Sequence, residues 1–75
     1  RDAVWRLANL LVEEANIDNV FTFTTTKAIL ASKLGMTQET FSRKLGELQD
    51  LELIQVISNK EIKITNLDKL KQLTR

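Results

Sequence analysis

Four residues of one short stretch have the side chains and the spacing that could read DNA bases. The four residues are Glu39, Ser42, Arg43 and Gly46, and their spacing of i, i+3, i+4 and i+7 would place them on one face of a helix. A carboxylate accepts from the amino group of cytosine, an arginine donates two hydrogen bonds to guanine, and a glycine lets the backbone come close. An ordinary solvated helix face has the same composition, so the neighbouring elements must decide between the two interpretations.

The opposite side of the same helix is apolar. The stripe expected to pack inward consists, at i, i+4 and i+7, of Phe41, Leu45 and Leu48. Lys44 and Leu51 flank this stripe, and the stem of Lys44 is expected to cover the edge of the core with its charge turned outward. The pattern therefore predicts a helix over 38–50 with one buried face and one polar face.

A second helix is predicted just before this one, because the turn between the two is very short. Gly35 stands where a helix needs a left-handed residue to end, and Thr37 can cap the next helix with Glu39 in its first turn. Ala31 and Gly35 are expected to let the two helices cross closely. Upstream, Thr26 is the expected cap of a helix whose apolar positions are Ile29, Leu30 and Leu34. Together these signals predict a helix-turn-helix.

The remaining segments predict the elements that support this motif. An amphipathic helix is expected over 2–15, followed by a turn at 16–19 and a β-branched and aromatic strand over 20–24. Phe21 and Phe23 alternate toward one side of that strand, which favours a core role over base stacking. Trp5 is also expected to pack against the core, with a stacking platform as the alternative.

Two short β-branched runs, 54–57 and 61–65, predict a hairpin that would form a wing. Asn59 lies in the connection and tolerates the positive φ that a tight turn needs, while Lys60 at the tip could reach a phosphate or simply keep the edge soluble. Asn66 is the expected cap of a short last helix. The predicted fold is mainly α with a small antiparallel sheet, a winged helix-turn-helix made of a three-helix core, a β-hairpin wing and a short C-terminal helix.

Composition narrows the possible functions. The 75 residues predict one domain, 1–75, and they include neither cysteine nor histidine, so disulfides and the usual zinc and iron-sulfur sites are excluded. There is also no glycine-rich phosphate loop. The candidate catalytic groups that remain are carboxylates at solvated helix positions, so we expect no enzyme and no metal site.

The net charge of +1 is too small to indicate nucleic-acid binding by itself. The distribution of charge is more informative, because the region between Lys27 and Lys44 holds four basic residues against Glu39 alone. No stretch is long and apolar enough for a membrane span, and no signal peptide is visible. We expect a cytoplasmic protein, of which this chain is a fragment.

The stretch LGMTQETFSRKLGELQDLELI, residues 34–54, resembles the C-terminal DNA-binding domain of bacterial regulators related to the cyclic-AMP receptor protein and the fumarate and nitrate reduction regulator. It follows the family pattern L-G-hydrophobic-[ST]-x-E-[ST]-x-[SG]-R-x-L, and the flanking elements extend the likeness over nearly the whole chain. The resemblance implies a transcription factor that places helix 38–50 in the major groove of double-stranded DNA.

The resemblance also implies roles for single residues. The residues implied to read bases are Gln38, Glu39, Ser42 and Arg43. Gln38 and Ser42 differ from the cyclic-AMP receptor protein in a way that points to a TTGAT-like rather than a TGTGA-like half-site. The residues implied or expected to hold phosphates are Thr26, Lys27, Thr37, Thr40 and Lys60.

Family members carry a sensor domain and a dimerisation helix ahead of this domain. The resemblance therefore implies a homodimer in the full-length protein and a monomeric fragment, no cofactor in this domain, and an effector that these residues do not identify. The surface between Glu14 and Thr22 corresponds to a region that touches RNA polymerase in some relatives. The alternative function is a winged helix that contacts another protein without binding DNA, which the near-neutral charge favours.

Overall fold

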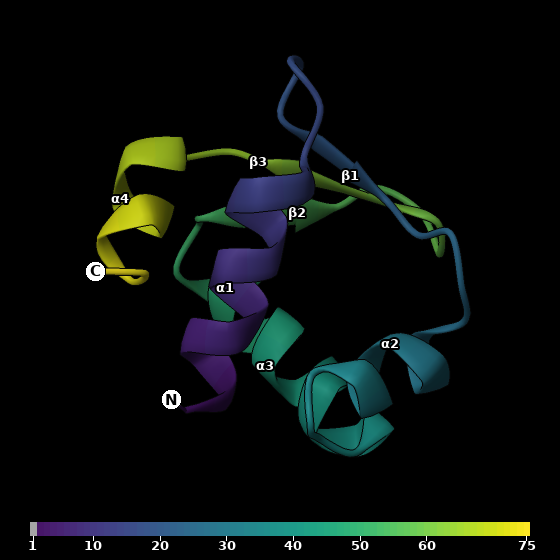
Figure 1. Ribbon diagram of the computed structural model, residues 1–75. Helices are drawn as coiled ribbons and strands as arrows, with labels where there is room; N and C mark the ends of the chain where they lie inside the picture. The colour runs from purple at the N-terminus through teal and green to yellow at the C-terminus, as the bar shows by residue number, and fades with distance from the viewer. Residues whose placement is uncertain (1) are drawn as a thin grey trace.

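The computed structural model describes residues 2–75 and contains the predicted elements in the predicted order. They are α1 (Ala3–Glu14), β1 (Val20–Thr22), α2 (Lys27–Lys33), α3 (Gln38–Asp50), β2 (Ile54–Val56), β3 (Glu61–Ile64) and α4 (Leu67–Gln72). In Figure 1 the strands lie above α2 and α3, and α4 lies beside α1. The predicted winged helix-turn-helix is confirmed. None of the helices in residues 2–75 is long and apolar enough to cross a membrane.

The three strands form one antiparallel sheet in the order β1-β3-β2. The first strand pairs with the hairpin, with Val20 opposite Lys63 and Phe21 opposite Ile62. The first strand is shorter than the predicted range 20–24 and ends at Thr22. One further backbone bond, from Phe23 N to Lys60 O at 2.8 Å, ties the chain to the wing before it turns toward α2.

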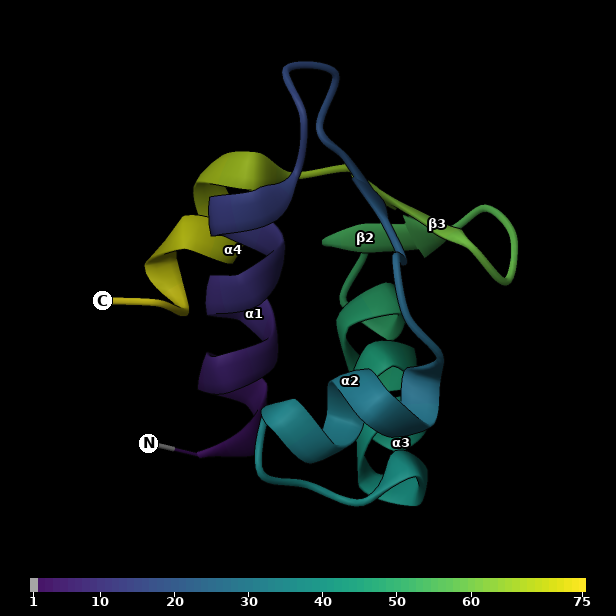
Figure 2. The ribbon, with the colours of Figure 1, turned by 45° about the vertical axis from the view of Figure 1, so that its right-hand side comes forward.

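One hydrophobic core lies between the helices and the sheet. The apolar stripe of α3 is buried as predicted, and α1 contributes a matching buried stripe of Leu7, Ala8 and Leu11. Figure 2 shows α2 crossing in front of α3, with α1 to one side. Ala31 is fully buried where α2 packs, which agrees with the expectation of a close crossing. The buried hydrophobic residues are Leu7, Ala8, Leu11, Phe21, Ala31, Phe41, Leu45, Leu48, Leu53, Ile54, Ile62, Ile64 and Leu70.

Two roles were expected of Gly35, ending α2 and letting α2 and α3 cross closely, and only the first is observed. Its φ of +73° confirms that it ends α2 in the left-handed conformation. A Cβ built at this position would meet no atom within 4 Å, so the glycine is not needed to bring the two helices together. The turn therefore requires glycine for its backbone conformation alone.

The prediction that Asn59 adopts a positive φ is wrong. Among residues 2–75 the non-glycine residues with positive φ are Asn19 and Glu52. The connection between β2 and β3 spans residues 57–60, which is longer than a tight two-residue turn, and the Ser58 hydroxyl accepts from Lys60 N at 3.1 Å. This side-chain bond closes the turn without a left-handed residue.

Two apolar residues expected on an inward stripe or its flank are exposed, Ile29 on α2 and Leu51 just after α3. Leu73, just after α4, is exposed as well. Leu51 is the C-cap of α3, where the chain leaves the helix and turns toward β2. Helical spacing predicts a face only while the helix continues, which explains why the periodicity failed at these last positions.

Candidate nucleic-acid interface

The first turn of α3 is fixed by Thr37. Its Oγ1 accepts from the Thr40 backbone N at 3.1 Å and also donates to Thr40 Oγ1 at 3.1 Å, so the predicted N-cap is confirmed. The Thr40 hydroxyl in turn accepts from Arg43 Nη2 at 3.4 Å. Three of the predicted DNA-binding side chains are thus connected in one row along the exposed side of the helix.

Opposite sides of α3 differ as the sequence predicts. Phe41, Leu45 and Leu48 are buried, while the side chains of Glu39 and Arg43 are 87% and 59% exposed. Glu39 Oε1 lies 3.8 Å from Arg43 Nη1, one helical turn away. An exposed pair at this spacing adds little to stability, so both groups can turn toward a ligand at small cost.

Lys27 is held over an aromatic side chain at the start of α2. Its Nζ lies 5.9 Å from the centre of the Phe23 ring, within the range of a cation–π contact. The Phe23 ring packs edge-on against Phe21 and Phe41, with centroid distances of 5.2 and 6.2 Å. Thr26, just before Lys27, caps α2 by accepting from Ile29 N at 3.2 Å, as predicted. The surface lysine is therefore anchored on the core.

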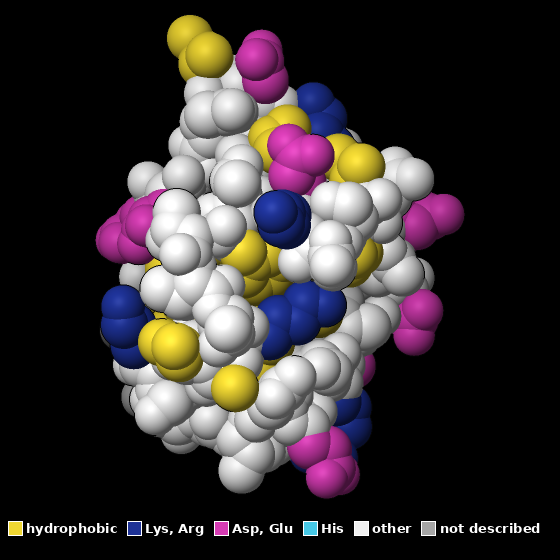
Figure 3. All heavy atoms as spheres, turned by 90° about the vertical axis from the view of Figure 1, so that its right-hand side faces the viewer, with side chains coloured by type: hydrophobic (Ala, Val, Ile, Leu, Met, Phe, Trp, Pro, Cys, Tyr) yellow, Lys and Arg dark blue, Asp and Glu magenta, His cyan; other side chains and the backbone are white. Residues whose placement is uncertain are grey.

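Four of the predicted DNA-binding residues surround one hollow, and they come from three parts of the chain. Thr26 and Lys27 open α2, Gln38 opens α3, and Lys60 lies in the wing turn. Figure 3 shows this side of the molecule, with Lys and Arg side chains gathered around a hollow that has apolar atoms within it. The residues that line the hollow are Phe23, Thr24, Thr25, Thr26, Lys27, Gln38, Asn59 and Lys60.

Ser42 and Gly46 complete the polar stripe of α3. Ser42 is exposed, and a Cβ built on Gly46 would meet no atom within 4 Å. Both positions are therefore open to an incoming surface. Packing inside this chain does not explain the glycine at position 46.

Lys44 behaves as predicted. Its side chain is only 27% exposed, and its Nζ forms an ion pair with Glu47 Oε2 at 3.0 Å. The stem covers the edge of the core while the charge stays at the surface.

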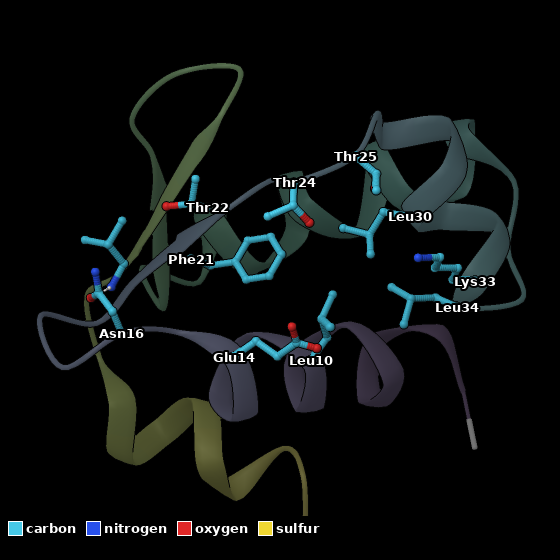
Figure 4. Close-up of a pocket in the computed structure, with 11 residues that line it drawn as sticks. Leu10, Glu14, Asn16, Phe21, Thr22, Thr24, Thr25, Leu30, Lys33 and Leu34 are labelled. Carbon is cyan, nitrogen blue, oxygen red and sulfur yellow. Dashed lines mark hydrogen bonds between the residues drawn. The ribbon is translucent and has the colours of Figure 1, made fainter.

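A second hollow lies between α1, β1 and α2 (Figure 4). Leu10, Phe21 and Leu30 give it apolar walls, and Glu14 and Lys33 lie at its rim. None of the predicted base-reading or phosphate-binding residues lines it, although Thr24 and Thr25 line both hollows. Within residues 2–75, no group of three metal-ligating side chains comes together anywhere.

The sequence interpretation missed two side chains that join separate elements of the fold. Gln49 Oε1 accepts from Val56 N at 2.8 Å, and Lys63 Nζ donates to Asp18 O at 2.7 Å. Both bonds join different elements, so no local pattern of residues could have signalled them. From the sequence, Gln49 was only a polar residue beside the buried stripe of the predicted helix. Lys63 was only a lysine in a predicted strand.

The helix pair, the exposed polar stripe and the adjacent wing define a winged helix-turn-helix domain. Residues 5–73 match the Crp-like helix-turn-helix domain. The chain belongs to this family, and it is a DNA-binding domain of a transcription regulator.

Solved structures of CooA from Carboxydothermus hydrogenoformans are similar to this chain. A mutant of CooA superposes with a TM-score of 0.89 at 23% identity, covering 100% of this chain and 38% of that chain. The CO-dependent transcription factor CooA in its imidazole-bound form gives 0.81 at 24% identity, covering 99% of this chain and 37% of that chain. At these identities the likeness shows the fold. No curated protein sequence matches this chain.

Proposed function

We propose that this domain binds one half of a palindromic DNA site with α3 in the major groove, and that its preferred half-site is TTGAT-like. The observation that carries the proposal is the exposed pair Glu39 and Arg43 on the side of α3 opposite the buried stripe. Glu39 would accept from a cytosine amino group and Arg43 would donate to guanine, while Gln38 and Ser42 would read the flanking base pairs.

The phosphate contacts would come from both sides of the recognition helix. Thr37 and Thr40 lie at its start, and their hydroxyls are already held by the capping bonds. Thr26, Lys27 and Lys60 surround the hollow beside Gln38. A DNA backbone running past α3 would meet cations on α2 and on the wing. These contacts would set the position of the domain on the DNA without specifying sequence.

The full-length protein would bind as a homodimer, because a palindrome presents two copies of the half-site related by a two-fold axis. This chain covers less than two fifths of the CooA chains that it resembles in fold, 38% and 37%. We propose that a sensor domain and a dimerisation helix belong to the same protein, with an effector bound outside this domain, and that the regulator works in the cytoplasm.

RNA polymerase is proposed as a second partner, and the turn between α1 and β1 as its contact. Asn16 Oδ1 accepts from Asp18 N and Val20 N, and Lys63 holds Asp18 O, so the turn is fixed. Ile17 at its tip is 97% exposed. Ile17→Ser should reduce transcription activation in a reconstituted assay and leave DNA affinity unchanged, and a parallel loss of DNA affinity would contradict this role.

The experiment that tests the proposed specificity is a fluorescence anisotropy titration at two salt concentrations. The ligands are a palindrome of TTGAT half-sites, one of TGTGA half-sites and a scrambled duplex. Tightest binding to the first, weakened by salt, is the expected result, because phosphate contacts release counterions. Equal affinity for all three would overturn the half-site, and no salt-dependent binding would favour the alternative, a winged helix that contacts another protein.

A further inference from the structure

Gln49 joins the last turn of the recognition helix to the strand that leads into the wing. Its side-chain Oε1 accepts from the backbone N of Val56 at 2.8 Å. Val56 is the last residue of β2, directly before the turn 57–60 that carries Lys60. The bond therefore connects the part of α3 that follows Arg43 to the end of β2, where the wing turn begins.

The direction of the Val56 N–H explains why α3 can reach it. Ile57 N donates to Glu61 O at 3.0 Å, and in an antiparallel pair successive residues turn their N–H groups alternately toward the partner strand and away from it. The N–H of Val56 consequently faces the open edge of β2, since β3 is the sheet neighbour of this strand. Gln49 occupies that edge from the helix side.

The other hydrogen bonds between α3 and β2 hold the start of the hairpin. Gln49 holds the end of β2 that is next to the wing turn. Glu52 N donates to the backbone O of Gln49 at 2.9 Å, and Leu53 N donates to Leu48 O at 3.1 Å. Thr65 Oγ1 donates to Glu52 O at 2.8 Å from the opposite end of β3. These contacts lie at residues 52–53, before β2 begins, whereas the Gln49 bond reaches the end of the strand next to the wing turn.

We propose that Gln49 is a positioning residue for DNA binding, which sets the wing against α3 so that Lys60 and Arg43 reach the same half-site. The inference rests on the proposed function, in which Lys60 binds a phosphate. Val56 lies at an open sheet edge where water could accept its N–H, so satisfying this donor does not require a side chain. What a glutamine adds over water is a fixed distance between the recognition helix and the wing.

The test is a double-mutant cycle between Gln49→Met and Lys60→Ala, measured as DNA affinity of the chain over a range of salt concentrations. Methionine keeps the length and helix propensity of the side chain and removes the amide acceptor. We expect each variant to bind DNA about twofold to tenfold more weakly, with a shallower salt dependence, because each loses the wing phosphate contact. The double variant should bind no more weakly than Lys60→Ala, because a displaced wing has already lost that contact.

Fold-changes that multiply in the double variant would overturn the proposal, and so would unchanged affinity in Gln49→Met beside a weakened Lys60→Ala. These results leave the proposed function intact. Unchanged affinity in Lys60→Ala would instead remove the wing phosphate contact from the proposed function, and this inference with it.

Two controls separate positioning from a general loss of stability. Thr65→Val removes the side-chain bond to Glu52 O at the same corner but leaves the wing end untouched, so it should not change DNA affinity or its salt dependence. Amide exchange of Val56, followed by NMR, should accelerate in Gln49→Met and stay slow in Gln49→Glu, which keeps an acceptor of the same length. Equal exchange of Val56 in all three proteins would overturn the assigned bond.

Discussion

The two sides of α3 have opposite tasks although they share thirteen residues of backbone. The inner side is buried against α1 and the sheet, and its large side chains hold the domain together. The outer side is exposed, and its Glu39–Arg43 pair contributes little to stability. The difference teaches that stability and base recognition can be changed separately in this helix, even at adjacent positions.

The strongest test of this separation is Phe41→Ala. Phe41 is fully buried and packs against Phe23, so its truncation should lower the free energy of unfolding by about 3 to 5 kcal/mol. The measurement is urea denaturation followed by circular dichroism. Ser42→Ala at the adjacent exposed position is the control and should change the free energy by less than about 0.5 kcal/mol. Similar losses in both variants would contradict the comparison.

Arg43→Ala should have the converse effect. It should weaken binding to the preferred duplex by about 1 to 3 kcal/mol and relax the preference at one base pair, with little change in unfolding. Titration against duplexes with each base pair substituted in turn would show this. Arg43→Lys keeps the charge but loses the two-pronged donor, so it should recover part of the affinity and little of the base preference. An unchanged base preference in the alanine variant would exclude Arg43 from base reading.

Thr37 lies where the two sides begin, so its loss should affect both properties. Thr37→Ala removes the cap of α3 and should lower the free energy of unfolding by about 1 kcal/mol. It should also weaken all DNA sequences about equally, because the proposed contact is to a phosphate. Thr37→Ser keeps the hydroxyl and should restore both properties. Recovery of stability without recovery of affinity in the serine variant would argue against the phosphate contact.

Glu52→Gly should give the smallest effect of these variants, because it changes neither the buried nor the exposed side of α3. Glu52 has a φ of 61°, a conformation that disfavours any side chain with a Cβ, and glycine would remove that strain. Its extra freedom in the unfolded chain offsets part of the gain, so we expect a net stabilisation of about 0.5 kcal/mol. Thermal unfolding would detect it, and base preference should be unchanged. A destabilised variant would show that the Glu52 side chain has a contact of its own.

The local signals in the sequence predicted most of the fold. The caps Thr26, Thr37 and Asn66 were found because each cap bond spans only three residues. The buried stripe of α3 was found because its period matches the helix throughout. Asn59 was misjudged because the Ser58 hydroxyl closes the wing turn in another way. The left-handed Glu52 was missed because glutamate carries no signal for that conformation.

The interface was harder to predict than the fold. Its residues could be named from the recognition helix and the family resemblance, and their roles in binding DNA remain predictions. That Lys60 and Lys27 lie around the same hollow depends on how the wing packs against α2, which spacing along the chain does not determine. The Gln49 bond was not predicted either, because it depends on the register of the sheet edge, which spacing along the chain does not determine.

The order of the strands has a consequence for the chain as it leaves the ribosome. The middle strand of the sheet, β3, is the last of the three in the sequence, and its partners on one side belong to the first half of the chain. β1 and β2 are not neighbours, so neither can form its sheet bonds until residues 61–64 have emerged. Until then Phe21 lacks its cross-strand neighbour Ile62. We therefore expect the helix-turn-helix, whose contacts are local, to form during synthesis and the wing to complete the domain at the end.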